Sequence, residues 1–297
     1  MLKFWTGMIA SAILLLTNSA KPEVSLSDFS GEWKSGALSA VVTTGKDKEC
    51  RSMMLIERTL RLERIPGNTQ KLRGQWGRET SYIWLSSNGG RCRWGNENSF
   101  VPVQSALMLF SITGSLESTS NKLAVDGTYE DCNGNGCAIW LNDQIKKPFH
   151  TDLVYDAGSI FDADPMVKGL VRFIRTGEVS ERLEAARLAA DRALSFVDKG
   201  NYDGFFQEAW KDSSVTGAEQ QNFKEGFASA RNMRGEVISR IPVREVYAEC
   251  WSNSLTLGDY ALVIRDAKTS KNAAGREVVM MGKQNGIWRV MWFDYLS

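Results

Sequence analysis

The sequence predicts an α+β protein in two parts, an antiparallel β-barrel-like domain followed by a domain of helices on a curved antiparallel sheet. Two observations lead to this fold class. Between residues 27 and 155, short runs of β-branched and aromatic residues alternate with turn clusters. Apolar residues at helical spacing then follow, and strand-like runs return from Glu236 to the C-terminus. Helices followed by an antiparallel sheet are typical of α+β layers.

Residues 1–20 have the features of a signal peptide. Lys3 gives a positive start, Phe4–Leu16 is an apolar run, and Thr17–Ala20 supplies small residues for cleavage. The run is shorter than the roughly 20 residues of a membrane span. An uncleaved anchor is the alternative. We expect a mature chain without a membrane span that is periplasmic or secreted.

The five cysteines indicate a disulfide framework, because exported proteins meet an oxidising environment. Cys132 and Cys137 flank a Gly-rich turn and are expected to pair. Cys50 and Cys92 remain as partners in the same half of the chain. Cys250 alternates with Val246 and Ala248 on one strand face, which predicts a buried free thiol.

The first domain, residues 27–155, is predicted to be a meander that closes into a small barrel and so removes exposed strand edges. Its strand-like runs after Trp33 are Ser52–Ile65, Lys71–Ser86, Ser105–Leu116, Lys122–Glu130 and Phe149–Tyr155. Gly31-Glu32-Trp33 resembles the Gly-x-Trp signature that opens lipocalin- and avidin-like barrels. That resemblance implies a tryptophan that plugs one barrel end.

Residues 156–177 are predicted to form a linker and a connecting helix. Asp164 is a suitable N-cap before Pro165, and Gly177 supplies a stop. Between them, apolar residues recur at helical spacing at Met166, Leu170, Phe173 and Ile174.

The second domain, residues 178–297, begins with three predicted helices: Ser180–Lys199, Tyr202–Trp210 and Ala218–Arg231. Four antiparallel strands are expected to follow, in Glu236–Trp251, in Tyr260–Arg265 and in a final hairpin. Pro242 is expected at an edge or a bulge, because proline lacks the donor that a strand ladder needs.

The final hairpin spans residues 276–293 and turns at Asn285-Gly286, the strongest short signal for a type I′ turn. Strand alternation predicts Trp288, Val290 and Trp292 on one face and Ile287, Met291 and Phe293 on the other. Both faces are apolar. The hairpin is therefore expected in the middle of its sheet.

From about Ala185 to the C-terminus the chain resembles a bacterial exported family of unknown function. This family has the nuclear-transport-factor-two-like (cystatin-like), cone-shaped fold. The residues that carry the resemblance are Lys199–Tyr202, Arg231, Gly235, Arg240, Gly258–Tyr260, Arg276–Val279 and Asn285–Val290. The family has no assigned activity, so the resemblance implies a fold and a compartment only.

A cationic, aromatic surface is the candidate binding site. Residues 45–93 carry an excess of basic charge and residues 94–165 an excess of acidic charge. The alternative is that these segments form neighbouring strands that neutralise each other. If they do not, an anionic envelope polymer or lipid headgroup is the expected ligand. The proposed ligand-binding residues are Arg61, Arg73, Trp76, Arg78 and Trp84.

No motif identifies a catalytic site, a metal or a cofactor. His150 is the only histidine, and no nucleophile motif lies beside it. Asp131–Gly136 matches the start of a calcium loop, but Asn142 stands where the loop needs a bidentate Glu. The near-neutral charge balance gives no reason to bind nucleic acid.

We therefore predict an exported, non-catalytic binding or scaffold protein of the bacterial envelope. Its barrel would bind a ligand or a protein partner, and its cone domain would act as a scaffold or dimerisation surface. The alternative is an isomerase or hydrolase that uses a cavity of the cone domain. The Asp and Tyr residues that could line such a cavity are Tyr247, Asp259, Tyr260 and Asp294.

Overall fold

The computed structural model describes residues 23–42, 51–84, 105–117, 120–134, 148–164, 169–209, 217–251, 256–271 and 274–296. A short helix, α1 (Leu26–Phe29), precedes the first strand. The strands of the first half are β1 (Gly31–Val42), β2 (Arg51–Arg64), β3 (Lys71–Trp84), β4 (Ser105–Leu116), β5 (Lys122–Asn133), β6 (Phe149–Asp156), β7 (Ser159–Asp164) and β8 (Gly169–Arg175).

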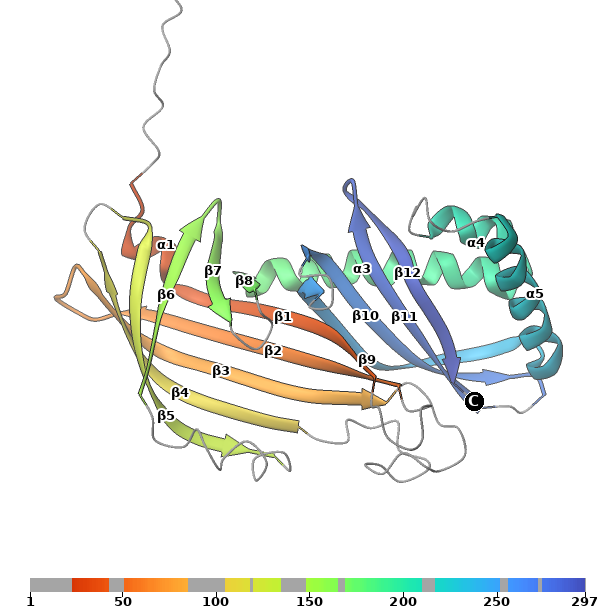
Figure 1. The fold of residues 1–297 in the computed structure, drawn as a ribbon, viewed down its shortest axis with the longest axis horizontal. Coiled ribbons are helices and arrows are strands. Elements are labelled where there is room, and N and C mark those ends of the chain that lie inside the picture. Colours follow the sequence, from red (N-terminus) through yellow and green to blue (C-terminus); the bar gives the residue numbers. More distant parts are fainter. Residues whose placement is uncertain are drawn as a thin grey trace, which may run out of the picture.

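These eight strands form a closed antiparallel barrel (Figure 1). Each strand pairs with the next, and β8 returns to β1 through the pairs Trp33↔Arg175 and Lys34↔Ile174. Alternate residues of the strands fill the interior with apolar side chains, including Leu60, Leu123 and Phe173. The structure thus confirms a closed β-barrel.

Trp33 lies at the β1–β8 closure and is 1% exposed. Its indole Nε1 donates a hydrogen bond to the carbonyl of Phe29 in α1 (2.8 Å). The guanidinium of Arg175 lies over the indole, 3.8 Å from the ring centroid, and donates to the carbonyls of Ser30 and Asp28. Helix α1 and Arg175 together enclose this tryptophan at the point where the barrel closes.

The predicted connecting helix over residues 165–177 is wrong for the described part of that range, because residues 169–175 form strand β8. Val171 and Phe173 point into the barrel core, while Ile174 packs against the second part of the chain. Apolar spacing in so short a segment does not separate strand from helix. Strands β1 and β7 each pair with β8 and supply the backbone partners that make this segment a strand.

The second half consists of three helices and four strands. They are α3 (Thr176–Asp198), α4 (Tyr202–Glu208), α5 (Gly217–Arg234), β9 (Val237–Trp251), β10 (Thr256–Thr269), β11 (Ala274–Gln284) and β12 (Ile287–Leu296). The four strands pair in sequence order, and α3 lies across their sheet with α4 and α5 at its far end (Figure 1). The described helices and strands agree with those predicted for this half, except that the first helix begins earlier than predicted, at Thr176 directly after β8. None of the described helices has the length and apolar character needed to cross a membrane.

Strand β1 joins the two parts into one twelve-stranded sheet. Its first residues pair with β8, whereas Ala37 and Leu38 pair in parallel with Cys250 and Trp251 of β9. Gly36 makes this crossing possible. A Cβ at Gly36 would stand 2.4 Å from the carbonyl oxygen of Tyr247, so only glycine admits β9 at this distance.

The final hairpin turns as predicted but lies elsewhere in the sheet. Asn285 and Gly286 both have positive φ (51° and 80°), as a type I′ turn requires. However, β12 is the edge strand rather than a central one. Its outer edge makes a single bridge to Ala209 after α4.

A β-bulge also changes which faces the hairpin residues occupy. The register shifts at Met291, so Met280 pairs with Trp292 and Met281 with Val290. Trp288, Val290 and Phe293 therefore pack under the helices, whereas Met291 and Trp292 pack on the opposite face of the sheet. The extra residue at the bulge is the reason why simple alternation fails here.

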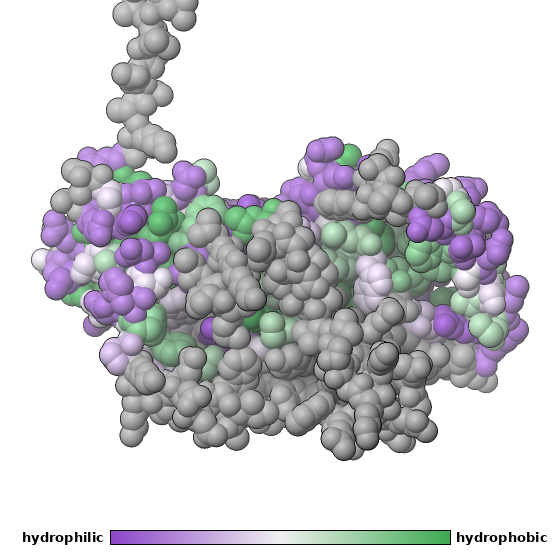
Figure 2. Space-filling model, viewed as in Figure 1, coloured by the Kyte–Doolittle hydropathy of each residue, from purple (hydrophilic) through white to green (hydrophobic). Residues whose placement is uncertain are grey.

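Pro242 lies at a bulge, as predicted. The partner of Ile264 is Arg244 and that of Arg265 is Pro242, so Val243 is the extra residue. On the surface, hydrophilic residues gather over the two ends of the molecule, and apolar residues appear between them (Figure 2).

Candidate functional site

The structure separates the residues of the predicted cationic, aromatic surface. Arg61 and Arg73 point outward and are exposed. Trp76 points inward and packs against Phe149 and Phe173 of the barrel core. Arg78 shares the inward side of β3 with Trp76, two residues away. The side chain of Trp84 lies outside the described residues. Arg61, Arg73 and Trp76 therefore do not form one surface.

The charge segregation persists in the barrel. Strand β4 carries no charged residue and lies between basic β3 and acidic β5. Neutralisation of Arg61 comes instead from Glu63 at 2.9 Å, on its own strand, and from Glu32 at 3.9 Å on β1. Exposed pairs of this kind contribute little to stability.

Two other predictions about single residues can be placed. His150 is exposed, and its Nδ1 lies 2.9 Å from Asp126. Cys132 is disulfide-bonded, whereas Cys50, Cys92 and Cys137 lie outside the described residues. The pairing Cys132–Cys137 therefore stays a prediction, and so does the free thiol of Cys250.

Asp259 joins the barrel to the helices and the second sheet. Its Oδ1 accepts hydrogen bonds from the Tyr247 hydroxyl (2.6 Å) and from Arg172 (2.7 Å). Arg182 donates to the same oxygen (2.8 Å), and Lys283 Nζ lies 3.5 Å from Oδ2. These four partners come from β9, β8, α3 and β11. One carboxylate thus connects four elements.

This network is poorly suited to proton transfer. Burial alone raises the pKa of Asp259, but the hydrogen bond from Tyr247 and the charges of Arg182 and Arg172 outweigh it and hold the pKa below its usual value. The pKa of Tyr247 is raised strongly, first by burial and then by the charge of Glu249 and the bond to Asp259. A catalytic acid or base needs a pKa near the working pH.

The other two residues of the enzyme hypothesis do not join this pair. Tyr260 packs on the opposite face of the sheet with Leu262 and Met280. The side chain of Asp294 lies outside the described residues. The structure therefore brings Tyr247 and Asp259 together as an ion-paired network, without Tyr260.

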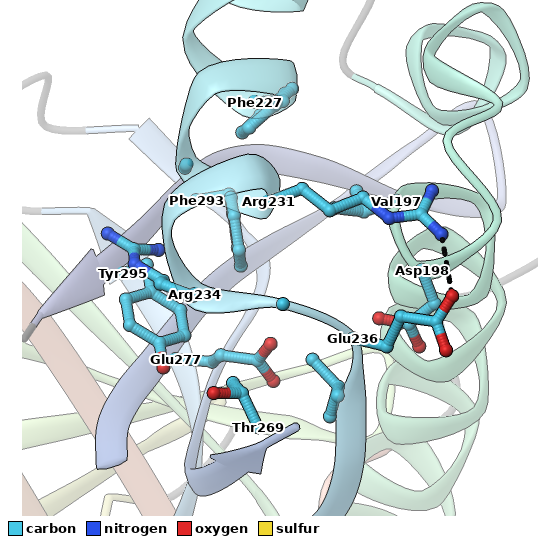
Figure 3. A pocket seen from close by; sticks show the side chains of 13 residues that line it. Val197, Asp198, Phe227, Arg231, Arg234, Glu236, Thr269, Glu277, Phe293 and Tyr295 are labelled. Carbon is cyan, nitrogen blue, oxygen red and sulfur yellow. Dashed lines mark ion pairs between the residues drawn. The ribbon is translucent and has the colours of Figure 1, made fainter. Parts of the chain in front are cut away.

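A small cavity of about 60 Å³ lies under α5 at the far end of the sheet (Figure 3). We call it the end cavity. It is lined by the end of α3, by α5 and by the strands β9–β12, and Figure 3 labels Val197, Asp198, Phe227, Arg231, Arg234, Glu236, Thr269, Glu277, Phe293 and Tyr295.

The charged groups around the end cavity are paired with one another. Arg240 donates to both oxygens of Asp198 (2.7 and 2.8 Å) and also to Glu277. Arg231 lies 3.6 Å from Glu236, and the guanidinium of Arg234 lies 3.4 Å from the ring centroid of Tyr295. We interpret this cavity as a packing feature between ion pairs.

A larger cavity of about 270 Å³ lies where the barrel meets the second part. We call it the junction cleft. It is bounded by β1–β4 of the barrel, by the N-terminal part of α3 and by β9. The residues that line it are Lys34, Ser35, Glu57, Arg58, Thr59, Gly77, Glu79, Leu107, Val179, Leu183, Glu245, Val246, Tyr247 and Glu249.

Glu249 is the most unusual residue of the junction cleft. Its side chain is fully buried (0% exposed), and Oε2 accepts a hydrogen bond from the backbone N–H of Gly36 (2.6 Å). Oε1 is also buried and has no hydrogen-bond partner among the described residues. Burial raises the pKa of Glu249 to about 8, although the Gly36 N–H and the charge of Arg172 act in the opposite direction.

Three further carboxylates belong to the same cleft. Glu57 and Glu79 are directly opposite on β2 and β3, an arrangement that like charges disfavour. Glu57 is paired with Arg244 (2.8 Å). Oε1 of Glu245 is buried without a hydrogen-bond partner among the described residues. The cleft thus has more carboxyl groups than cations, and some of its carboxyl oxygens accept no hydrogen bond from the described residues.

Sequence reasoning missed this site. The one available signal was Glu249 itself, an acid next to Ala248 in an apolar strand. Within the described part of the chain, no three His, Cys, Asp or Glu side chains are close enough to share a metal ion. The chemistry that remains is the binding of a ligand that donates hydrogen bonds.

No protein-family model matches the chain, and no curated protein matches it. Among solved structures, it is similar to a Campylobacter jejuni protein described as an NTF2-like transpeptidase. The identity is 11% and the TM-score is 0.27, and the match covers 35% of this chain and 94% of that chain.

Proposed function

We propose that this chain is an exported, non-catalytic binding protein of the bacterial envelope, and that the junction cleft holds its ligand. The observation that carries this proposal is Glu249, a fully buried side chain with an unused oxygen at the wall of a 270 Å³ cavity. Buried polar atoms are normally hydrogen-bonded, and an exception calls for an explanation, for which we propose a bound ligand.

Export is supported by two features of the chain. Residues 1–20 have the composition of a signal peptide. Cys132 is disulfide-bonded, and disulfides persist mainly in oxidising compartments such as the periplasm.

The hydrogen bonds of Asp259 and the protonation of Tyr247, which lie near the cleft, favour binding over catalysis. Asp259 is saturated by hydrogen-bond donors and cations, and Tyr247 keeps its proton. Neither group is available to accept or release a proton near neutral pH. The second candidate, an isomerase or hydrolase, is favoured by a single group, Glu249, whose pKa of about 8 suits a general acid.

The experiment is a thermal-shift screen of the purified protein against small organic cations, anions and neutral polyols, followed by calorimetry of each hit. Thr59→Tyr places a bulky side chain in the cleft from the exposed side of β2. Thr113→Tyr is the matched control, because Thr113 is exposed on β4 outside the cleft.

We expect at least one hit that T59Y abolishes and T113Y retains. Hits that T59Y leaves unchanged would contradict the assignment of the site. Turnover of a hit, lost in Glu249→Gln, would favour the enzyme instead.

A further inference from the structure

The junction cleft is lined by more carboxyl groups than cationic groups, so its charge becomes clearly negative once Glu249 ionises. Four glutamates line it, against Lys34 and Arg58. The nearby arginines are engaged elsewhere. Arg244 pairs with Glu57, and Arg172 and Arg182 bind Asp259. An ionised carboxylate is an acceptor with two oxygens and donates nothing.

Two positions show that this charge is not merely an exposed acidic cluster. Oε1 of Glu249 belongs to a side chain that is completely buried, so water does not solvate it from the surface. Oε1 of Glu245 is buried beside the same cavity. Leaving a buried acceptor unsatisfied is unfavourable, and the penalty is larger for a charged group.

The cross-strand pair Glu57↔Glu79 points to the same kind of ligand. Arg244 neutralises Glu57, whereas no hydrogen bond or ion pair of Glu79 is found among the described residues. Like charges directly opposite in a sheet repel each other. A bound positive charge at this wall would remove the repulsion.

Resting on the proposed function, we infer that the ligand of the junction cleft is a small organic cation that carries ammonium or guanidinium groups. Such groups donate several N–H bonds and pair with carboxylates that lie apart from one another. A compact metal ion needs its ligands gathered at one point, which the described residues do not provide. A cavity of about 270 Å³ limits the ligand to a small molecule.

The protonation of Glu249 makes the binding of a cation depend on pH. Burial holds the pKa of this carboxyl near 8, so at pH 7 most molecules carry the neutral acid. Its negative charge, and with it the attraction for a cation, develops as the pH rises through this value. Alkylammonium groups with a pKa near 10.4 are still charged at pH 9.

The test is isothermal titration calorimetry of the full chain with three probes of equal length: 1,4-diaminobutane, 1,4-butanediol and succinate. We expect heat from 1,4-diaminobutane only, with tighter binding at pH 9 than at pH 7. Glu79→Gln and Glu245→Gln each weaken this binding about tenfold or more. Glu63→Gln is the matched control, since Glu63 lies on β2 but does not line the cleft.

The outcomes separate this inference from the proposed function. Binding of the diol or of succinate that Thr59→Tyr abolishes would keep the cleft as the binding site and overturn the cationic ligand. No heat from the diamine, or equal weakening by E63Q and E79Q, would also overturn it. Diamine binding that survives T59Y would contradict both the site and the ligand class.

Discussion

The end cavity and the junction cleft are both lined by charged side chains, but they use their charges differently. Around the end cavity, Arg240 holds Asp198 and Glu277 in a closed set of hydrogen bonds. Around the junction cleft, Glu245 and Glu249 each retain a buried oxygen without a partner among the described residues. Charges that are paired within the fold satisfy one another, whereas a buried acceptor without a partner can still take a hydrogen bond from a donor.

The largest expected effect concerns the paired region. Arg240→Met removes the shared cation and leaves two carboxylates together, one of which, Glu277, is 3% exposed. Breaking a buried ion pair from one side costs about 3–5 kcal/mol. Urea melts of the variant and the parent protein measure the loss.

Arg187→Met is the matched control for that variant. Arg187 pairs with Glu184 one turn away on α3, at an exposed position. A surface pair is worth about 0–1 kcal/mol. Equal losses of stability for the two variants would show that the ion pairs of Arg240 contribute no more than an ordinary surface pair.

The next largest expected effect is the stability loss on removal of the Tyr247 hydroxyl at the junction cleft. Tyr247 lines the cleft, but its hydroxyl is committed to Asp259 at 2.6 Å. Tyr247→Phe is expected to cost about 1.5–3 kcal/mol, the range for a hydrogen bond to a charged group. Denaturant melts of Y247F and of the parent protein measure this loss of stability.

Tyr202→Phe is the comparison for Y247F, because Tyr202 packs its ring on Phe227 and no hydrogen bond of its hydroxyl is found in the described part of the chain. It is expected to change stability by less than about 0.5 kcal/mol. If Y247F changed stability as little as Y202F, the hydrogen bond from Tyr247 to Asp259 would not stabilise the wall of the cleft.

The smallest expected effect concerns His150, whose partner Asp126 is an exposed carboxylate, in contrast to the buried Glu249. The hydrogen bond to Asp126 and the charges of Asp126 and Asp152 raise the pKa of His150, against a smaller opposing effect of desolvation. Asp126→Asn should lower this pKa. Because the chain has one histidine, a single imidazole resonance in an NMR titration reports the change. An unchanged titration would show that the pair at 2.9 Å is not formed in solution.

Much of the fold could be predicted, because its signals are local. Alternating strands, turn clusters and Asn285-Gly286 indicated the barrel strands and the final hairpin. Strand β8 was missed because Asp164-Pro165 is a good helix start, and because one of the two strands that pair with it, β1, comes from a distant part of the sequence. The bulge at Met291 has no sequence signal of its own, so the faces of β12 were assigned incorrectly.

The candidate site could not be predicted for a related reason. Glu249 receives its hydrogen bond from Gly36, 213 positions earlier, and its burial exists only because β9 crosses β1 there. Conversely, Arg73 and Trp76 of the predicted surface are an odd number of residues apart on β3 and so face opposite sides. Contact between distant strands decided both outcomes.

The same substitution placed in both regions tests the comparison most directly. Glu249→Gln and Glu277→Gln remove a charge from a buried side chain without changing its shape. The pKa of Glu249 is raised on folding from about 4.5 to about 8. The stability that this group contributes is therefore complete below pH 4.5 and is lost as the pH rises toward 8.

Urea melts of both variants at pH 5 and pH 8 give the decisive measurement. At pH 8 we predict that E249Q is more stable than the parent protein, by about 4 kcal/mol, because each pH unit between the unfolded and the folded pKa of Glu249 is worth about 1.4 kcal/mol. At pH 5 most of this gain disappears. E277Q should lose about 2–3 kcal/mol at both pH values, because Arg240 then keeps Asp198 as its charged partner but loses the buried Glu277 carboxylate. If E249Q were destabilising at pH 8, or if both variants shifted stability in the same direction, the distinction between the two regions would be wrong.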